Sequence, residues 1–157
     1  MSEGDALQHT TKWIREIAEY SDEISVNPMN IQKRTIVDRI FRNREYRPPW
    51  LWSLVQMIRD VHSDIHPDGG NASTRLIVHP TAAGSIRGAH NCGRCDKEVA
   101  AAIERYSVSG SLLEFEGLAC ECESRWAAEI SLDTSLPIPL GSGLDRRLDA
   151  VEALLSP

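Results

Sequence analysis

The sequence has no apolar run that approaches the roughly 20 residues a helix needs to cross a membrane. It also has no internal repeat, no low-complexity tract and no P-loop, dinucleotide fingerprint or nucleophile elbow. Its first residues, MSEGDALQHTTK, are polar and acidic, so we expect neither a secretory signal nor a transit peptide. With 41% apolar and 25% charged residues, the composition is that of a globular protein. We expect a cytoplasmic protein with no membrane partner.

The net charge of −6 argues against indiscriminate binding to nucleic acid. The charge is uneven, however. The segment from Lys33 to Arg47 holds six Lys or Arg residues against only Asp38 and Glu45. A local excess of this kind can attract a phosphate backbone, although basic runs are usually solvated faces of a helix.

The four cysteines form two close pairs, Cys92-Gly-Arg-Cys95 and Cys120-Glu-Cys122, with 24 residues between the pairs. Two pairs at chelate spacing predict a structural Zn²⁺ held by four thiolates, Cys92, Cys95, Cys120 and Cys122. Disulfides are less favoured because nothing marks the chain as secreted. A redox-active CxxC motif would leave the second pair without a role, and four unrelated buried thiols are the remaining interpretation.

A catalytic zinc site would keep one position open for water. His90 lies two residues before Cys92, so a site of His90 with three cysteines stays open as an alternative. The zinc deaminase signature needs a His-x-Glu upstream of the cysteines, and no histidine here is followed two residues later by Glu. Four thiolates would close the coordination sphere, which favours a structural ion.

Apolar periodicity and turn residues divide the chain into expected elements. We expect helices over residues 7–20, from Asn27 or Ile31 to Asn43, over 50–65 and 96–106, and strands over 74–79, 111–118 and 126–132. A Pro/Gly/Ser-rich linker then precedes a short amphipathic helix over residues 144–155.

The stretches WIREIAEY and KRTIVDRIFRNREYRPPWLWSLVQMIRDV, within residues 11–62, resemble the helix-turn-helix domains of repressor-like regulators of actinobacteria and their phages. The matching positions are Thr35-Ile36, Ile40-Phe41, Asn43 and Pro49-Trp50. The resemblance implies a recognition helix from about Ile31 to Asn43. Gln32, Lys33, Arg34 and Arg39 would then read bases in the major groove, while Arg42, Arg44 and Arg47 would contact phosphates.

Together these observations predict an α+β protein in three parts. Residues 1–66 form a helical, helix-turn-helix-like domain, residues 74–133 form a small zinc-bound α+β module resembling a zinc ribbon or treble clef, and residues 134–157 form a linker and a short helix. The predicted function is that of a non-catalytic, sequence-specific regulator of transcription that binds double-stranded DNA. A protein partner or a homodimer would use the C-terminal part. The alternatives are a protein-interaction or assembly component, such as a phage adaptor, and a small zinc hydrolase.

Overall fold

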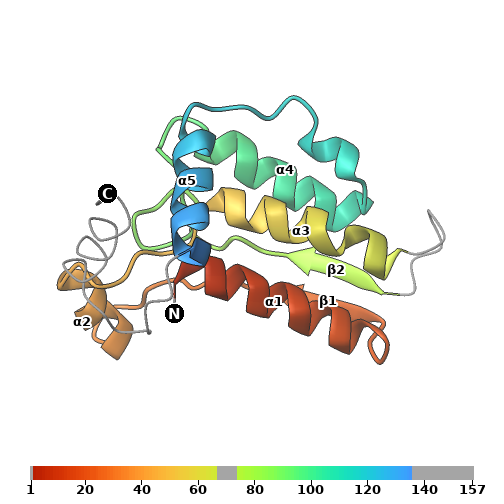
Figure 1. The fold of residues 1–157 in the computed structure, drawn as a ribbon, viewed down its shortest axis with the longest axis horizontal. Helices are drawn as coiled ribbons and strands as arrows, with labels where there is room; N and C mark the ends of the chain where they lie inside the picture. The colour runs from red at the N-terminus through yellow and green to blue at the C-terminus, as the bar shows by residue number, and fades with distance from the viewer. Residues whose placement is uncertain (1, 67–73, 136–157) are drawn as a thin grey trace, which may run out of the picture.

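The computed structural model describes residues 2–66 and 74–135, which form helices around a two-stranded sheet (Figure 1). The elements in chain order are α1 (Glu3–Ala18), β1 (Glu23–Val26), α2 (Ile36–Arg42), α3 (Leu51–Ile65), β2 (Arg75–Val78), α4 (Asp96–Ser109), the 3₁₀ helix η1 (Leu112–Phe115) and α5 (Cys122–Ser135). The α+β class is therefore confirmed. The linker and the helix expected over residues 144–155 lie outside the described residues.

Helix α3 is at the centre of the fold. Apolar residues recur along one face of it at helical spacing, and all five of these side chains are buried: Leu51, Leu54, Ile58, Val61 and Ile65. Helix α1 packs on one side of α3 and α4 on the other (Figure 1), so residues 51–55 of α3 are buried all round, whereas Arg59 and Ser63 in its second half are exposed. A helix that is covered on several sides needs apolar residues around most of its circumference.

The two strands pair in parallel, with Glu23 opposite Arg75 and Val26 opposite Val78. Parallel strands need a long crossover connection, and here it contains α2 and α3. The pairing joins the two segments that the sequence analysis assigned to separate domains. Buried side chains from residues 14–65 and 76–122 also belong to one hydrophobic core.

Two helix termini are fixed by capping residues close to them in the sequence. A capping box starts α1, where the Ser2 hydroxyl accepts from the Asp5 backbone N–H and the Asp5 carboxylate accepts from the Ser2 N–H, each at 3.1 Å. Gly110 ends α4 in the left-handed conformation, with φ of +67°. No helix within residues 2–66 and 74–135 combines the length and the apolar character that a bilayer-spanning segment requires.

Two expected strands are wrong. Residues 112–115 form η1, which begins where the Ser111 hydroxyl accepts the Leu113 N–H, and residues 122–135 form α5. Short alternating runs do not distinguish a strand from a helix, so tertiary packing decided both. Packing of α5 against α1 and the hydrogen bond from Trp126 Nε1 to Ser53 Oγ, at 2.8 Å, hold α5 on the body of the protein.

The helix predicted from Asn27 or Ile31 to Asn43 is also shorter than expected. Thr35 caps α2, since its hydroxyl accepts the Asp38 backbone N–H at 3.1 Å, and the helix begins only at Ile36. Ile31 is buried in an irregular segment, where its backbone N–H donates to the Arg87 carbonyl at 2.8 Å. Of the predicted base-reading residues, Gln32, Lys33 and Arg34 therefore lie in the turn before α2 and not on a helix.

Candidate metal centre and an adjoining basic cleft

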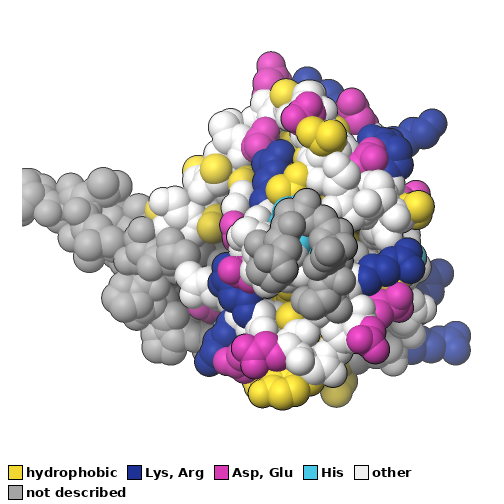
Figure 2. Space-filling view, turned by 90° about the vertical axis from the view of Figure 1, so that its right-hand side faces the viewer, with side chains coloured by type: hydrophobic (Ala, Val, Ile, Leu, Met, Phe, Trp, Pro, Cys, Tyr) yellow, Lys and Arg dark blue, Asp and Glu magenta, His cyan; other side chains and the backbone are white. Residues whose placement is uncertain are grey.

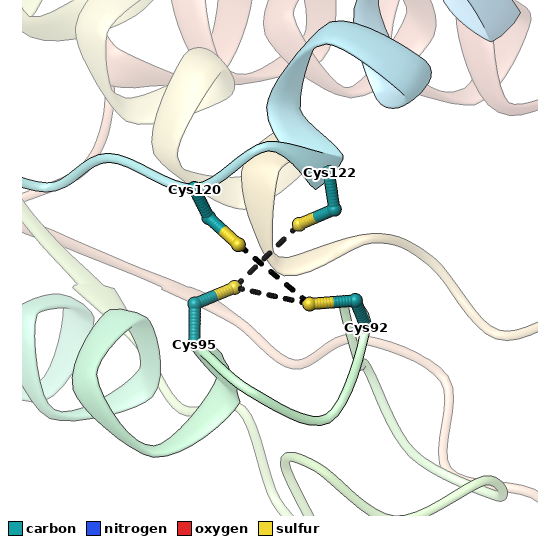
Figure 3. Close-up of side chains that lie close together, drawn as sticks. All are labelled: Cys92, Cys95, Cys120 and Cys122. Atoms are coloured by element: carbon teal, nitrogen blue, oxygen red, sulfur yellow. Dashed lines mark hydrogen bonds between the residues drawn. The ribbon is translucent and has the colours of Figure 1, made fainter.

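All four cysteine side chains point toward a common centre between two segments of the chain (Figure 3). Cys92 and Cys95 come from the loop that enters α4, Cys120 comes from the loop before α5, and Cys122 is the first residue of α5. The Sγ atoms of Cys92 and Cys120 are 3.7 Å apart, those of Cys95 and Cys122 are 3.6 Å apart, and those of Cys92 and Cys95 are 4.0 Å apart. All four Sγ atoms lie within 4.8 Å of one another.

These distances suit a single tetrahedral ion. A tetrahedron with metal–sulfur bonds of about 2.3 Å places its sulfur atoms about 3.8 Å apart. A disulfide would require about 2.05 Å, and the four thiols are not joined by disulfides. The cysteines predicted from their spacing are thus brought together in a group that could hold one metal ion.

Asp96, the first residue of α4, shapes the loop that carries the first cysteine pair. Its carboxylate accepts the backbone N–H of Asn91 at 2.9 Å and that of Gly93 at 2.6 Å. Gly93 has φ of +88°, a left-handed conformation that glycine adopts without steric cost. The loop therefore turns tightly enough for Cys92 and Cys95 to face the same point.

Two buried side chains donate hydrogen bonds to the sulfur atoms. Trp52 Nε1 donates to Cys122 Sγ at 3.2 Å, and Asn91 Nδ2 donates to Cys95 Sγ at 3.3 Å. Such donors stabilise thiolate charge and orient the ligands of a metal. Neither residue was identified from the sequence as a donor to sulfur. Trp52 lies on a helix more than 60 residues from Cys122, and only the folded chain brings the two together.

The thiols differ in how readily they ionise. The backbone N–H of Arg94 lowers the pKa of Cys92 to about 6, whereas burial raises the pKa of Cys95 and of Cys122. A bound cation would offset the cost of ionising the two buried thiols. Outside the cluster, an exposed ion pair between Arg94 and Glu121, at 2.8 Å, connects the two cysteine loops.

His90 lies in a different environment. Its Nδ1 is 2.8 Å from the Gly88 carbonyl oxygen, which can only accept, so this nitrogen carries the proton. The group of possible metal ligands found in the described part of the chain consists of the four cysteines. The alternative site of His90 with three cysteines is therefore not the arrangement that the structure shows.

His90 instead lines an open cleft of about 670 Å³ beside α2, which we call the basic cleft. Its lining includes the arginines Arg42, Arg44 and Arg47 and the rings of Phe41, Tyr46 and His90. Two distant segments meet here, the end of α2 with the loop after it and the loop that precedes Cys92. Three of the residues predicted to contact DNA are thus brought together, whereas Gln32, Lys33, Arg34 and Arg39 are exposed elsewhere around α2.

Asp38 organises the basic residues around α2. Its buried carboxylate pairs with Arg42 at 3.0 Å and with Arg87 at 2.7 Å, and it accepts the Arg34 backbone N–H at 2.9 Å. These contacts, the Arg34 N–H first and then the two guanidinium groups, hold the pKa of Asp38 well below its usual range. The loop that carries Arg87 is thereby tied to α2.

The chain is similar to proteins of archaea. It is 34% identical, over 133 residues, to archaeosine synthase subunit beta of Methanosarcina acetivorans, an alignment that covers 85% of this chain and 37% of that protein. It is 35% identical, over 127 residues, to archaeosine synthase subunit beta of Thermococcus kodakarensis, covering 80% of this chain and 37% of that protein. An uncharacterized protein of Methanocaldococcus jannaschii is 29% identical over 121 residues, covering 75% of this chain and 31% of that protein.

The chain thus spans only about a third of the length of these curated relatives. No protein-family model matches the sequence, and no solved structure matches it significantly. What the comparisons establish is a similarity that extends over most of this chain.

These names correct the predicted function. The prediction of a sequence-specific, phage-type regulator of transcription with double-stranded DNA as its partner is wrong, because two of the relatives are named as subunits of a synthase. The roles assigned to Gln32, Lys33, Arg34, Arg39, Arg42, Arg44 and Arg47 at DNA are therefore withdrawn. The expectation of a protein unconnected with catalysis also conflicts with these names, since two of the three relatives are named as subunits of a synthase. The chain is similar, over most of its length, to a part of archaeosine synthase subunit beta.

Proposed function

We propose that this chain is a component of an assembly that makes archaeosine, a modified nucleoside of transfer RNA, and that it acts there as a metal-stabilised RNA-binding module. The observation that carries the proposal is the similarity to archaeosine synthase subunit beta, at 34% and 35% identity over 85% and 80% of this chain. The chain corresponds to 37% of those proteins, so the remaining functions of the assembly would reside in other polypeptide segments. A subunit is by name part of an assembly, so the predicted role as an assembly component is kept without its phage setting.

The metal in this proposal is a single Zn²⁺ held by Cys92, Cys95, Cys120 and Cys122. Tetrahedral sites of four sulfur ligands favour zinc or iron, and zinc is the usual ion of structural Cys₄ sites. Four thiolates complete the coordination sphere, so the ion would hold the α4 and α5 loops together and would not activate water. Its role at this site is structural.

The RNA-binding role is supported by the charge around α2. Seven basic residues lie on α2 or on the segments next to it, against three carboxylates, one of which is Glu3 at 4.0 Å from Arg47: Lys33, Arg34, Arg39, Arg42, Arg44, Arg47 and Arg87 against Glu3, Asp38 and Glu45. The whole protein carries a net charge of −6, so this excess is local. Figure 2 shows the end of the molecule opposite α2, where Lys and Arg side chains are interspersed with Asp and Glu.

The metal is tested by elemental analysis of the purified chain. We expect one zinc per chain, its loss in Cys92→Ser, and its retention in His90→Ala, which alters a neighbouring side chain that does not belong to the cysteine group. Cys92 is exposed, so its replacement by serine removes a ligand without opening a cavity in the core. Iron in place of zinc, or equal losses in the two variants, would contradict the assignment.

The biological role is tested in the organism that encodes the chain. We expect deletion of its gene to lower the archaeosine content of tRNA, measured by mass spectrometry of digested nucleosides, and a plasmid copy to restore it. In vitro, the chain should retain a tRNA transcript on a filter at about 0.15 M salt, where long-range attraction is screened within about 8 Å. Unchanged archaeosine after deletion would overturn the role in the pathway, and absence of tRNA retention would overturn the RNA-binding role.

A further inference from the structure

One of the three arginines that line the basic cleft makes no ion pair or hydrogen bond through its guanidinium group in the described part of the chain. Arg47 donates to the carbonyl oxygens of Pro48 and His90, each at 2.9 Å, and its guanidinium lies 3.9 Å from the centre of the Trp50 ring. Arg42 pairs with Asp38. The guanidinium of Arg44, by contrast, has no hydrogen-bond or ion-pair partner within residues 2–66 and 74–135. Arg44 is therefore available to bind an anion at the rim of the cleft.

The backbone at Arg44 is unusual for an arginine. Helix α2 ends in a Schellman motif, in which the Glu45 N–H donates to the Ile40 carbonyl at 3.1 Å and the Arg44 N–H donates to the Phe41 carbonyl at 3.0 Å. This motif places Arg44 in the left-handed region, at φ of +63°, where glycine is the favoured residue. An arginine here carries a conformational cost that glycine would not, and its unpaired side chain gives no compensating contact inside the fold.

Flat rings lie next to this charge. Phe41 and Tyr46 are partly exposed along the cleft, and the His90 ring, which is held by the hydrogen bond from Nδ1 to the Gly88 carbonyl, lines it as well. One carboxylate, Glu45, is present at the cleft beside the three arginines. Aromatic rings next to guanidinium groups are the chemistry with which proteins hold unstacked bases and their phosphates. The volume of about 670 Å³ is within the range of small-ligand sites.

We propose that the basic cleft holds one unstacked nucleotide of an RNA chain, with Arg44 at its phosphate and the Phe41 and Tyr46 rings against its base. This inference rests on the proposed function and names the surface through which the module would contact its RNA. A paired helix stacks its bases internally, so the cleft selects a looped or single-stranded segment.

Arg44→Gly is the most informative substitution, because it separates binding from folding. Glycine relieves the left-handed backbone, so we expect the melting temperature to stay the same or to rise. Affinity for a tRNA transcript should fall about tenfold, and the slope of log affinity against log salt should decrease by about 0.7 to 0.9, the value for one lost phosphate contact. A residue with only a structural role would instead lose stability and affinity together.

Arg34→Gly is a matched control. Arg34 is also an exposed arginine beside α2 with a left-handed backbone, at φ of +66°, but it does not line the cleft. The Arg34→Gly substitution removes the same charge in the same backbone geometry, so it measures what a charge beside α2 contributes at long range without a contact in the cleft, and we expect a loss of affinity under threefold. Phe41→Leu, which keeps apolar bulk but removes the flat ring, should weaken binding by about fivefold or more.

The position of the RNA is tested directly with a tRNA transcript that contains 4-thiouridine. After irradiation, we expect the cross-linked peptide to contain residues 41–47. Equal losses of affinity in Arg34→Gly and Arg44→Gly, or cross-links confined to other segments, would overturn this inference while leaving tRNA binding intact. Equally strong competition by polyglutamate would show attraction of acidic chains in general and would also overturn it. Failure of the parent protein to bind tRNA would overturn the proposed function itself.

Discussion

The hydrogen bond from Trp52 to Cys122 allows the metal centre to be tested without changing a ligand. Trp52 is 2% exposed, and its Nε1 lies 3.2 Å from Cys122 Sγ. Trp52→Phe removes this donor while keeping an aromatic ring in the core. A hydrogen bond to an ionised acceptor contributes about 1.5–3 kcal/mol, which corresponds to roughly 10- to 150-fold in a dissociation constant. Residues that support metal ligands typically contribute about 10- to 100-fold, in the same range.

The assay is transfer of zinc from the folded chain to a coloured chelator over a series of chelator concentrations. Trp126→Phe is the matched control, because this substitution also removes an indole donor near α3. The Trp126 Nε1 donates to the hydroxyl of Ser53 at 2.8 Å and not to a sulfur atom. We expect zinc affinity to fall at least tenfold in Trp52→Phe and less than threefold in Trp126→Phe. Unchanged affinity in Trp52→Phe, or equal losses in both variants, would refute the reasoning that the indole stabilises a metal-bound thiolate.

Two further predictions concern the fold around the two sites. The buried Ser107 hydroxyl accepts the Val78 N–H at 2.9 Å. Ser107→Ala should lower the free energy of unfolding, measured in urea, by about 1–3 kcal/mol, because the substitution leaves a buried donor without its partner. A loss of stability no larger than that caused by Ser63→Ala, at an exposed position, would contradict this prediction. Asp38 has a pKa below that of an unfolded aspartate, so its charge stabilises the native state at neutral pH and this contribution is lost as the pH falls below about 4. Asp38→Asn should therefore melt at a lower temperature than the parent protein at pH 7, with the difference shrinking at pH 3; a difference independent of pH would show that the carboxylate charge is not the cause.

Features encoded in short stretches of sequence were predicted well. The cysteine spacing was sufficient to group Cys92, Cys95, Cys120 and Cys122, since chelate pairs are a local property of the chain. The helices α3 and α4 begin within one residue of the predicted positions, because their apolar stripes are long and their boundaries are marked by Pro49 and by the acidic first turn at Asp96.

Features of the fold that depend on contacts between residues far apart in the sequence were not predicted. The strand β1 lies between two expected helices, where no element was expected, and its four residues become a strand only by pairing with β2 some 50 residues later. The apolar stripe that extended the predicted α2 back to Ile31 had another cause, since Ile31 is buried where its backbone meets Arg87. The basic cleft joins two segments about 40 residues apart, so the sequence indicated its charge but not the rings and the histidine around it.

The metal centre and the basic cleft are connected through the backbone of residues 90 and 91. The His90 carbonyl accepts from Arg47 at 2.9 Å, and the His90 N–H donates to the Pro49 carbonyl at 3.1 Å, which holds this wall of the cleft against the α2–α3 loop. The next residue, Asn91, donates to Cys95 Sγ and accepts from the Trp52 N–H.

A metal that fixes Cys95 therefore also fixes the backbone on which one wall of the cleft is built. A preorganised binding surface loses less conformational entropy when a ligand arrives, so metal occupancy and nucleotide affinity are expected to be linked. Because such linkage is reciprocal, RNA bound in the cleft would in turn slow the loss of the ion. A structural ion held by the four cysteines would then contribute to RNA binding without any contact to RNA.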